Sequence, residues 1–345
     1  MRVCLYSVNL TFILSPLLSN SIDNLSSFAI QFFFQYFAPF TMGNKSISFD
    51  PAKDIPSLKG KVILITGGNL GLGKQSALDL SKHTPSELWI AARGEESGKA
   101  AVEEIRKVSP GVSVKFLRLD LASFKSIKEA ARTFLSSVSR LDTLYLNAGM
   151  MGGPHVTTED GYEKQFGTNH MGHALLFKLL KPFLLQTALI PGADVRVIIL
   201  SSAGHRFGKG KLLFDSFKST AKELSPVDKY CQSKLANLLY ARALAKHVPE
   251  ITSVSIYPGD IKTGLFTSNG GSWFITVIRN VLLPLTAVSV EDGVKNQLWA
   301  GTAKGVKSGE YYEPVGVTGK QSVYAYDDDV AEKLWEWTEK ELDCV

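Results

Sequence analysis

Apolar runs of strand length alternate with helix-like segments along most of this chain. The first run, Val62 to Ile65, is apolar at every position, which is typical of a strand covered on both faces of a parallel sheet. Strands are predicted over residues 61–66, 88–93, 114–119, 141–146, 195–200, 254–257 and 311–312. Helices are predicted over 71–83, from 165–173 onward, around 230–234 and over 330–342. Strands that alternate with helices predict an α/β fold with a parallel sheet.

A glycine-rich turn follows the first predicted strand. Gly67, Gly71 and Gly73 form the pattern TGxxxGxG at the start of the helix predicted from Gly71 to His83. Glycines let the backbone turn tightly and approach a pyrophosphate without a Cβ in the way. The helix directs its first amides and the positive end of its dipole at the phosphates. A strand before the turn and a helix after it favour a dinucleotide site over an ordinary turn.

The end of the second predicted strand bears on which cofactor binds. An acidic residue there would bind the ribose 2′-hydroxyl of NAD. Arg93 occupies this position instead, and its guanidinium suits a 2′-phosphate, so the sequence predicts NADP(H). The alternative interpretation is an arginine in solvent at the start of a helix. Glu95 and Glu96 follow closely and argue against NADP(H).

Tyr230 and Lys234 lie four residues apart in a segment that is predicted to be helical. Side chains at positions i and i+4 are neighbours on one helix face. A neighbouring ammonium favours the phenolate and lowers the pKa of a tyrosine from its usual value of about 10. The pair could therefore exchange a proton with a carbonyl or an alcohol. The same spacing occurs on ordinary solvated helix faces, so the surrounding motifs decide between the two interpretations.

Polar or small residues end the other predicted strands. Asp120 follows the strand 114–119, where a carboxylate could accept a hydrogen bond from an adenine amino group. Asn147 opens an Asn-Ala-Gly turn after the strand 141–146. Three further segments are Asn169 at the start of a long apolar helix, Ser201-Ser202 after the strand 195–200, and 258–263 after the strand 254–257. Each is an ordinary strand end by itself, and it is their joint order that carries weight.

With these motifs in order, the chain resembles the short-chain dehydrogenase/reductase family over about residues 58–320. The matching motifs are TGGNLGLG (66–73), DL (120–121), NAG (147–149), Asn169, Ser202, YCQSK (230–234) and PGDIKT (258–263). The segments NHMGH and SSAGH, with the long gap from Ser202 to Tyr230, are most similar to the retinol-dehydrogenase-like branch and its fungal relatives. The resemblance implies a Rossmann-type, doubly wound, seven-stranded parallel sheet with helices on both faces, in a single domain.

The resemblance also implies the roles of four catalytic residues. Tyr230 is the general acid in reduction and the base in oxidation. Lys234 lowers the pKa of Tyr230 and hydrogen-bonds the nicotinamide ribose. Ser202 holds the substrate oxygen, with Ser201 as the alternative. Asn169 positions a water that links Lys234 to solvent. These roles agree with the need for hydroxyl donors at an oxygen that develops negative charge.

The cofactor contacts carry over from the same motifs. Leu72 presents its backbone to the pyrophosphate or the nicotinamide ribose, and Asp120 and Asn147 match positions at the adenine and its adjacent ribose. Ile261 offers backbone groups to the carboxamide, and Thr263 offers its hydroxyl to the carboxamide or a phosphate. The other residues of the predicted NADP(H) site are Gly67, Gly71, Gly73, Arg93, Tyr230 and Lys234.

Composition is that of an ordinary globular enzyme. The 345 residues are 45% hydrophobic and 21% charged, with a net charge of +5. The basic residues are spread along the chain, so the charge indicates no nucleic-acid partner. Cys4, Cys231 and Cys344 have neither metal-site nor disulfide spacing, so no metal is predicted. Cys231 is interpreted as a packing residue.

Residues 1–57 lie outside the fold pattern, and 58–345 form the predicted catalytic domain. The apolar segments 10–18 and 27–40 are interrupted, and neither reaches the roughly 18 uninterrupted apolar residues of a membrane-spanning helix. Three interpretations remain for residues 1–41: a membrane-surface anchor, a disordered leader, or a translation start placed too early. We favour the last, with Met42 as the natural start. The predicted location is the cytoplasm, with membrane association as the alternative.

The predicted substrate cap covers residues 264–290. Its segment 270–285 is apolar, which indicates an apolar substrate, an apolar face resting on a membrane, or a buried core helix. The predicted function is NADP-dependent interconversion of a ketone or aldehyde and an alcohol on an apolar small molecule; a role in secondary metabolism follows only from the resemblance. The alternatives are a membrane-associated retinoid or steroid dehydrogenase and a non-catalytic NADP-binding sensor or scaffold. The sequence does not distinguish a monomer from a homo-oligomer.

Overall fold

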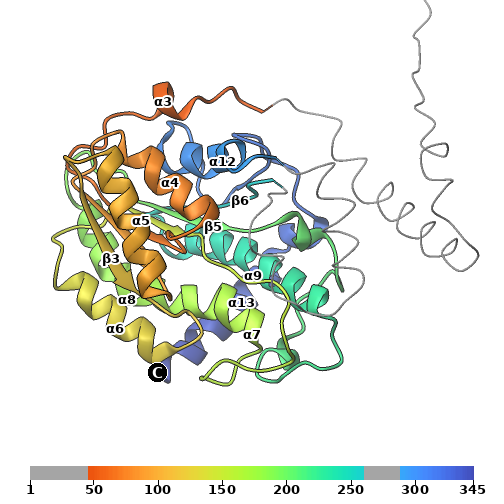
Figure 1. Ribbon diagram of the computed structural model, residues 1–345. Helices are drawn as coiled ribbons and strands as arrows, with labels where there is room; N and C mark the ends of the chain where they lie inside the picture. The colour runs from red at the N-terminus through yellow and green to blue at the C-terminus, as the bar shows by residue number, and fades with distance from the viewer. Residues whose placement is uncertain (1–45, 260–287) are drawn as a thin grey trace, which may run out of the picture. The chain divides into compact units, whose positions relative to one another are not determined.

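The computed structural model describes residues 46–259 and 288–345 (Figure 1). The chain divides into two units, Met1–Lys45 and Ser46–Val345, and the fold is that of the second unit. The predictions for residues 1–41, for Ile261 and Thr263, and for the cap up to residue 287 fall outside the described residues. Phe49 and Ile55 are buried in the core of the second unit. The boundary predicted at residue 57 therefore lies inside this unit, because the residues before it contribute core side chains.

A seven-stranded parallel sheet forms the centre of this unit, in the order β3-β2-β1-β4-β5-β6-β7. Its strands are β1 Val62–Thr66, β2 Glu87–Ala92, β3 Ser113–Arg118, β4 Thr143–Leu146, β5 Arg196–Leu200, β6 Thr252–Ile256 and β7 Tyr311–Tyr312. The predicted fold class is confirmed, and every predicted strand is present with ends that differ by at most two residues. Strand order reverses between β1 and β4, and at such a switch point ligands bind outside the carboxyl ends of the strands.

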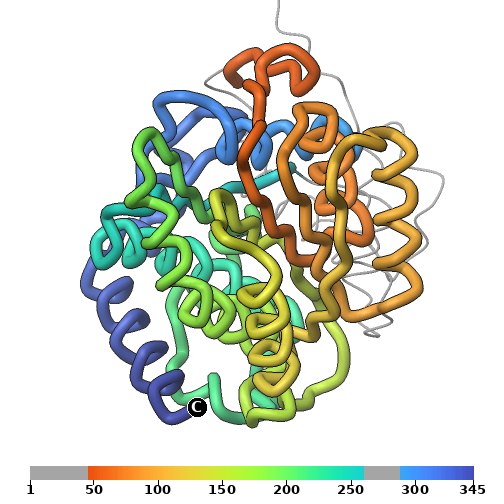
Figure 2. The backbone as a smooth tube through the Cα atoms, turned by 90° about the vertical axis from the view of Figure 1, so that its left-hand side faces the viewer, coloured from red at the N-terminus to blue at the C-terminus, as the bar shows by residue number. Residues whose placement is uncertain are grey.

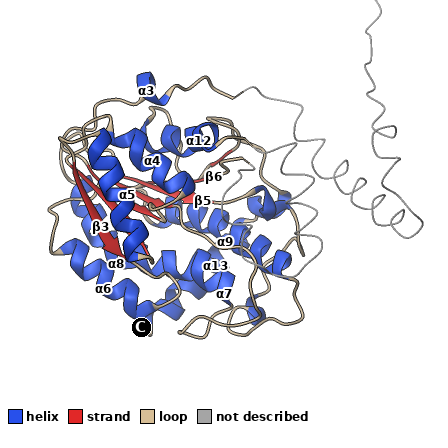
Figure 3. Ribbon diagram, in the orientation of Figure 1, coloured by secondary structure: helices blue, strands red, loops and turns tan. Residues whose placement is uncertain are grey.

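Helices cover both faces of the sheet, as Figures 1 and 3 show. Among the described residues the α-helices are α3 Pro51–Asp54, α4 Gly71–Ser81, α5 Glu95–Val108, α6 Phe124–Leu135, α7 Lys164–Phe166, α8 Gly172–Ala188, α9 Pro226–His247, α12 Val290–Thr302 and α13 Asp328–Asp343. Helices α4, α5 and α12 pack on one face, and α6, α8 and α9 pack on the other. The last helix, α13, packs on the outside of α9 (dark blue in Figure 2).

Strand β1 explains why its sequence is a continuous apolar run. Val62 and Leu64 point into the core shared with α6, α8, α9 and α13, which we call the first core. Ile63 and Ile65 point into the core shared with α4, α5 and α12, which we call the second core. Successive side chains of a strand alternate between faces, so a strand with a core on each side is apolar throughout.

Helix α9 begins where its sequence provides a capping box. The Asp228 amide donates to Ser225 Oγ (3.0 Å), and the Ser225 amide donates to the Asp228 carboxylate (3.3 Å). Pro226 occupies the first helical position, where its missing N–H costs nothing. The helix start is therefore fixed one turn ahead of Tyr230. Within the described ranges no helix has the length and apolar character needed to cross a bilayer.

Candidate active site

Three strand ends meet at the switch point and bring together segments that are far apart in the sequence. The turn after β1 contains Thr66 and Gly67, the turn after β4 contains Asn147 to Gly149, and Ser201 and Ser202 follow β5. Strands β1, β4 and β5 are neighbours in the sheet. Because the strands are parallel, their carboxyl ends lie at one edge, and the predicted motifs converge there.

The glycine turn packs directly on the turn after β4. A Cβ added at Gly73 would lie 2.6 Å from Asn147 Nδ2 and closer still to the Gly67 carbonyl oxygen. Gly67 has a φ of 65°, and a Cβ added there would lie 3.0 Å from the Ala148 Cα. Contacts this short exclude any side chain at Gly73. The glycines therefore form a cradle that side chains would fill.

Helix α4 presents its first amides at this cradle. It begins at Gly71, and no side chain caps it at Leu70. The first backbone N–H groups of a helix lack intrahelical partners and favour an anion. Leu72 lies in this first turn, so its backbone N–H is among the groups that a phosphate could use. Its carbonyl accepts a long hydrogen bond from Gln297 of α12 (3.4 Å).

Asn147 carries an acceptor that has no partner in the described part of the chain. Its backbone N–H donates to Thr66 Oγ1 (2.9 Å), and its side-chain amide donates to the Thr66 carbonyl (2.8 Å). The remaining atom, Oδ1, is buried and has no hydrogen-bond partner among the described residues. Buried acceptors are nearly always paired in native proteins. An orphaned acceptor beside the glycine cradle fits a ligand that brings a donor, such as a ribose hydroxyl or an adenine amino group.

Asp120 lies beyond the end of β3. One carboxylate oxygen accepts from the Ala122 backbone N–H (2.9 Å), and the Asp120 backbone N–H donates to Ser126 Oγ (3.0 Å). These two bonds fix the carboxylate at the strand end. Only one of its oxygens is used in them, so the other could accept a hydrogen bond from adenine, as the sequence predicts.

Arg93 immediately follows β2 and is exposed. It has no ion-pair partner among the described residues. Glu95, which argued against a 2′-phosphate, pairs instead with Lys99 (2.7 Å), and this hydrogen bond holds the Glu95 pKa below its usual value. The guanidinium therefore stays open to a ligand at the end of β2.

Tyr230 and Lys234 share one face of α9, as their spacing predicts. The ammonium lies 5.7 Å from the centroid of the tyrosine ring, and both side chains are buried. Lys234 Nζ donates to the Leu200 carbonyl at the end of β5 (3.1 Å). Burial lowers the Lys234 pKa to about 8. A Cβ at Gly149 would lie 3.3 Å from Nζ, so this glycine brings the turn after β4 against the ammonium.

The two serines after β5 differ in what their hydroxyls do. Ser201 Oγ is buried and donates to the Lys234 backbone carbonyl (2.8 Å), so it anchors α9 to the sheet. Ser202 is partly exposed, and its Oγ accepts from the Gly204 N–H (3.0 Å), a bond that does not use its hydroxyl proton. A Cβ on Gly204 would lie 3.1 Å from the Tyr230 ring and 3.3 Å from Ser202 Oγ. Ser202 is thus the serine that lies beside Tyr230.

Asn169 lies in a π-helical turn, Gly167–Met171, between α7 and α8. Its side-chain amide donates to the Met150 carbonyl (3.0 Å) and to Ser233 Oγ (2.9 Å), and its Oδ1 accepts from the Met150 N–H (2.8 Å). Both side-chain N–H groups are therefore used by the protein, while Oδ1 can still accept a second hydrogen bond, as from a water of the predicted kind. Single π-turns inside helices often mark functional sites.

His173 is a site residue that the sequence reasoning missed. Burial lowers its pKa to about 4, so the ring is neutral at physiological pH. Nδ1–H donates to the Asn169 carbonyl (3.0 Å), and Nε2 therefore accepts from Thr66 Oγ1 (2.9 Å). Thr66 Oγ1 in turn accepts from the N–H of Asn147 (2.9 Å). The i+4 spacing from Asn169 was the available signal, but the partner on β1 is 107 residues away.

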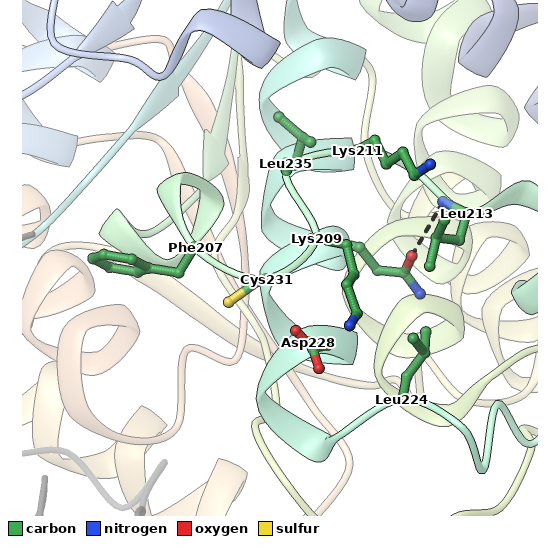
Figure 4. Close-up of a pocket in the computed structure, with 10 residues that line it drawn as sticks. Phe207, Lys209, Lys211, Leu213, Leu224, Asp228, Cys231 and Leu235 are labelled. Carbon is green, nitrogen blue, oxygen red and sulfur yellow. Dashed lines mark hydrogen bonds between the residues drawn. The ribbon is translucent and has the colours of Figure 1, made fainter. Parts of the chain in front are cut away.

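A cleft lies beside α9 on a different helix face from Tyr230 and Lys234 (Figure 4). Ten residues line it: Phe207, Lys209, Gly210, Lys211, Leu213, Leu224, Asp228, Cys231, Gln232 and Leu235. In Figure 4 the charged ends of Lys209 and Asp228 turn toward one another. Cys231 is buried as its interpretation as a packing residue requires, and burial raises its pKa to about 12.

Comparisons with known proteins point in one direction. The family model described as short chain dehydrogenase matches residues 61–271. A short-chain dehydrogenase/reductase of Armillaria gallica is 38% identical over 293 residues, which cover 83% of this chain and 91% of that protein. Human retinol dehydrogenase 13 is 35% identical over 286 residues, covering 81% and 83%. A solved structure from Mycobacterium paratuberculosis, 26% identical, superposes with a TM-score of 0.66 over 86% of this chain and 98% of that one.

Proposed function

The chain belongs to the short-chain dehydrogenase/reductase family, on its retinol-dehydrogenase-like branch, and we propose that it interconverts a ketone or aldehyde and the corresponding alcohol with NADP(H). Proteins of this family are oxidoreductases that bind nicotinamide cofactors. One observation carries the proposal. The Ser202 hydroxyl and the Tyr230 ring lie against the same glycine, and the Lys234 ammonium lies next to that ring.

The proposed chemistry divides between the cofactor and the protein. The nicotinamide, when bound, would supply or accept the hydride at the substrate carbon. In reduction, Tyr230 donates its proton to the substrate oxygen, and the neighbouring Lys234 ammonium stabilises the phenolate that remains. The Ser202 hydroxyl donates to the same oxygen and stabilises its developing negative charge. In oxidation, Tyr230 acts as the base and the steps run in reverse.

The choice of NADP(H) rests on the end of β2. Arg93 is exposed there, without an ion-pair partner among the described residues, while Glu95 is engaged by Lys99. No carboxylate follows β2 directly at the place where NAD-binding members bind the 2′-hydroxyl. The cofactor residues proposed in the described part are Gly67, Gly71, Leu72, Gly73, Arg93, Asp120, Asn147, Tyr230 and Lys234, and the motif PGDIKT adds Ile261 and Thr263.

We propose an apolar substrate because the segment 270–285 is apolar in sequence. A role in secondary metabolism remains a prediction from family resemblance. The similarity to human retinol dehydrogenase 13 favours a second candidate, a membrane-associated retinoid or steroid dehydrogenase. Fractionation of cells that express the full chain separates the two candidates. A membrane-associated dehydrogenase would be found in the membrane pool, and the first candidate would not.

The first test replaces the proposed proton donor. Tyr230→Phe removes the hydroxyl and keeps the ring, so we expect NADPH affinity to stay within about twofold while turnover falls by about 10²–10⁴-fold. NADPH absorbance is followed with a panel of ketones and aldehydes, and binding is followed by NADPH fluorescence. Tyr162→Phe, which removes a hydroxyl that donates to Glu341 of α13 (2.8 Å), is the matched control and should keep wild-type turnover. Unchanged turnover in Tyr230→Phe would refute the proposed chemistry.

The second test concerns the cofactor. Hydrogen bonds to charged groups contribute about 1.5–3 kcal/mol, so Arg93→Ala should reduce the preference for NADP over NAD by about 10- to 100-fold. The affinities for NADPH and NADH are measured in parallel for each variant. Arg132→Ala, on the exposed face of α6, removes the same charge far from the predicted site and should leave the preference unchanged. An equal preference in wild type and Arg93→Ala would contradict the assignment.

A further inference from the structure

A segment near the C-terminus holds the turn that carries Ser202. We call residues 313–326 the C-terminal arm. Arg206, the last residue of the turn, forms a largely buried ion pair with Glu313 and donates from its Nε to the Lys320 carbonyl (3.1 Å). Next to it, the Ser322 N–H donates to His205 Nε2 (3.1 Å). The arm therefore binds the turn at two consecutive residues, His205 and Arg206.

His205 is the connector between the arm and the turn. Its side chain is fully buried, and its ring packs edge-on against Tyr311 with centroids 5.0 Å apart. Nδ1 lies 2.6 Å from the Ser202 carbonyl, and the His205 backbone N–H lies 3.1 Å from the same oxygen. A carbonyl can only accept, so Nδ1 carries the proton. Nε2 must then be the acceptor, as its bond from Ser322 requires.

These bonds exclude a proton-transfer role for the ring itself. Both ring nitrogens are used, one as a donor and one as an acceptor. Burial and the nearby charge of Arg206 lower the His205 pKa to about 3, so the ring is neutral at physiological pH. A neutral, fully bonded imidazole has no proton to give to a substrate.

We propose that His205 is a positioning residue that fixes the Ser202 hydroxyl beside Tyr230. The inference rests on the proposed function, since it gives Ser202 the task of binding the substrate oxygen. His205 occupies the Ser202 carbonyl with two donors, while Ser202 Oγ accepts from Gly204. The Gly204 backbone lies against the Tyr230 ring. The C-terminal arm thereby becomes part of the support of the catalytic hydroxyls.

Two conservative variants separate the two bonds of the ring. His205→Asn can place an amide N–H near the position of Nδ1 and keep the donor to Ser202. His205→Gln can place an amide oxygen near Nε2 and keep the acceptor for Ser322. We expect His205→Asn to retain kcat within about threefold. We expect His205→Gln and His205→Ala to lower kcat by about 10- to 100-fold without a change in NADPH affinity. This loss is smaller than the roughly 10²–10³-fold expected when a hydroxyl or amide donor to the substrate oxygen is removed altogether.

A double-mutant cycle tests whether His205 acts through Ser202. In a Ser202→Ala background, His205→Gln should cost less than about threefold in kcat, because the hydroxyl that it positions is already absent. An equal loss in both backgrounds would show a role independent of Ser202. A kcat in His205→Asn as low as that in His205→Gln would also overturn the proposal.

Hydrogen exchange gives a readout that does not depend on turnover. In His205→Gln the Gly204 amide should lose protection while the Ser322 amide keeps it, and His205→Asn should show the opposite pattern. If the two variants show the same exchange pattern, His205 does not link the C-terminal arm to the turn that carries Ser202. If wild type and Tyr230→Phe are equally inactive on every carbonyl, the proposed function fails, whereas the exchange pattern still decides whether His205 holds the turn.

Discussion

At the scale of single residues, the ammonium of Lys234 is buried without a carboxylate partner among the described residues. Its one protein acceptor there is the Leu200 carbonyl, which also accepts from Asn237 Nδ2 (3.0 Å). Burial disfavours the charged form and lowers the pKa from 10.5 to about 8. The residue is thus held at a cost in stability, which is common for groups whose charge serves a site.

This cost predicts the effect of Lys234→Met. The folded-state pKa lies below the unfolded value, so the folded state binds fewer protons between pH 8 and pH 10.5, and wild-type stability gains with pH in that window. Below pH 8 the charged lysine carries the full penalty. We expect the variant to be more stable at pH 7 by up to about 3 kcal/mol, with the gain vanishing above pH 10.5, while turnover is lost. Leu200 keeps its bond from Asn237.

Thermal unfolding at pH 7 and at pH 10.5 checks this prediction. Lys125→Met, at an exposed position on α6, changes the same atoms without relieving burial and should show no comparable gain. A lower unfolding temperature for Lys234→Met at pH 7 would mean that the buried ammonium stabilises the fold.

Sequence reasoning reached some of these residues and not others. The adjacency of Tyr230 and Lys234 follows from helix geometry, because both lie on one element. The difference between Ser201 and Ser202 depends on a bond to Lys234, 33 residues away. His205 depends on Ser322, 117 residues away. Such partners are set by the packing of distant elements, which no local pattern contains.

At the scale of elements, the glycine turn between β1 and α4 serves two purposes at once. Gly73 lies in the first turn of α4, and a Cβ there would meet the Gly67 carbonyl and Asn147 Nδ2. Both neighbours are held in place, because Asn147 donates to the Thr66 carbonyl (2.8 Å) and the Gly67 N–H donates to the Ala91 carbonyl (2.8 Å). The turn is therefore tightly packed even apart from any phosphate that it binds.

Gly73→Ala should accordingly weaken both folding and cofactor binding. Overpacking of this kind costs about 1–3 kcal/mol, and the displaced turn should lower NADPH affinity by at least about 10-fold. Gly111→Ala is the matched control, because a Cβ at Gly111 would have no neighbour within 4 Å. Denaturant unfolding and NADPH fluorescence give the two quantities. Equal behaviour of the two variants would mean that the turn yields easily.

The helix predicted from residue 165 onward contains a π-turn that the sequence pattern did not predict. Its apolar pattern continues through residues 165–188, yet the chain forms α7, a π-turn over Gly167–Met171 and then α8. One extra residue in a turn barely alters an apolar pattern. At this turn Asn169 bonds to Met150 and Ser233, and these two partners belong to other parts of the chain. The helical pattern of the segment itself contains no sign of them.

At the scale of the whole second unit, the first and second cores pack on opposite faces of the sheet and hold in place the strand ends and helices that form the proposed site. Helix α13 closes the first core, where Leu334 is fully buried and Thr338 Oγ1 lies 3.1 Å from His170 Nε2. On the surface, Lys178 of α8 pairs with Glu339 (2.9 Å). Residues near the C-terminus thus stabilise α8 and α9, which carry residues of the proposed site.

The N-terminal limit of this unit gives the last prediction. A chain that begins at Met42 keeps all of Ser46–Val345, including the bond from the Ile47 N–H to the Val315 carbonyl (2.9 Å). It should therefore unfold at the temperature of the full chain and bind NADPH with the same affinity. A chain that begins at Ser57 is the control. It lacks Phe49 and Ile55, two side chains of the second core, and should lose several kcal/mol, since removing one large buried side chain costs about 2–5 kcal/mol. If the Met42 chain were destabilised as much as the Ser57 chain, residues 1–41 would have to contribute to the fold.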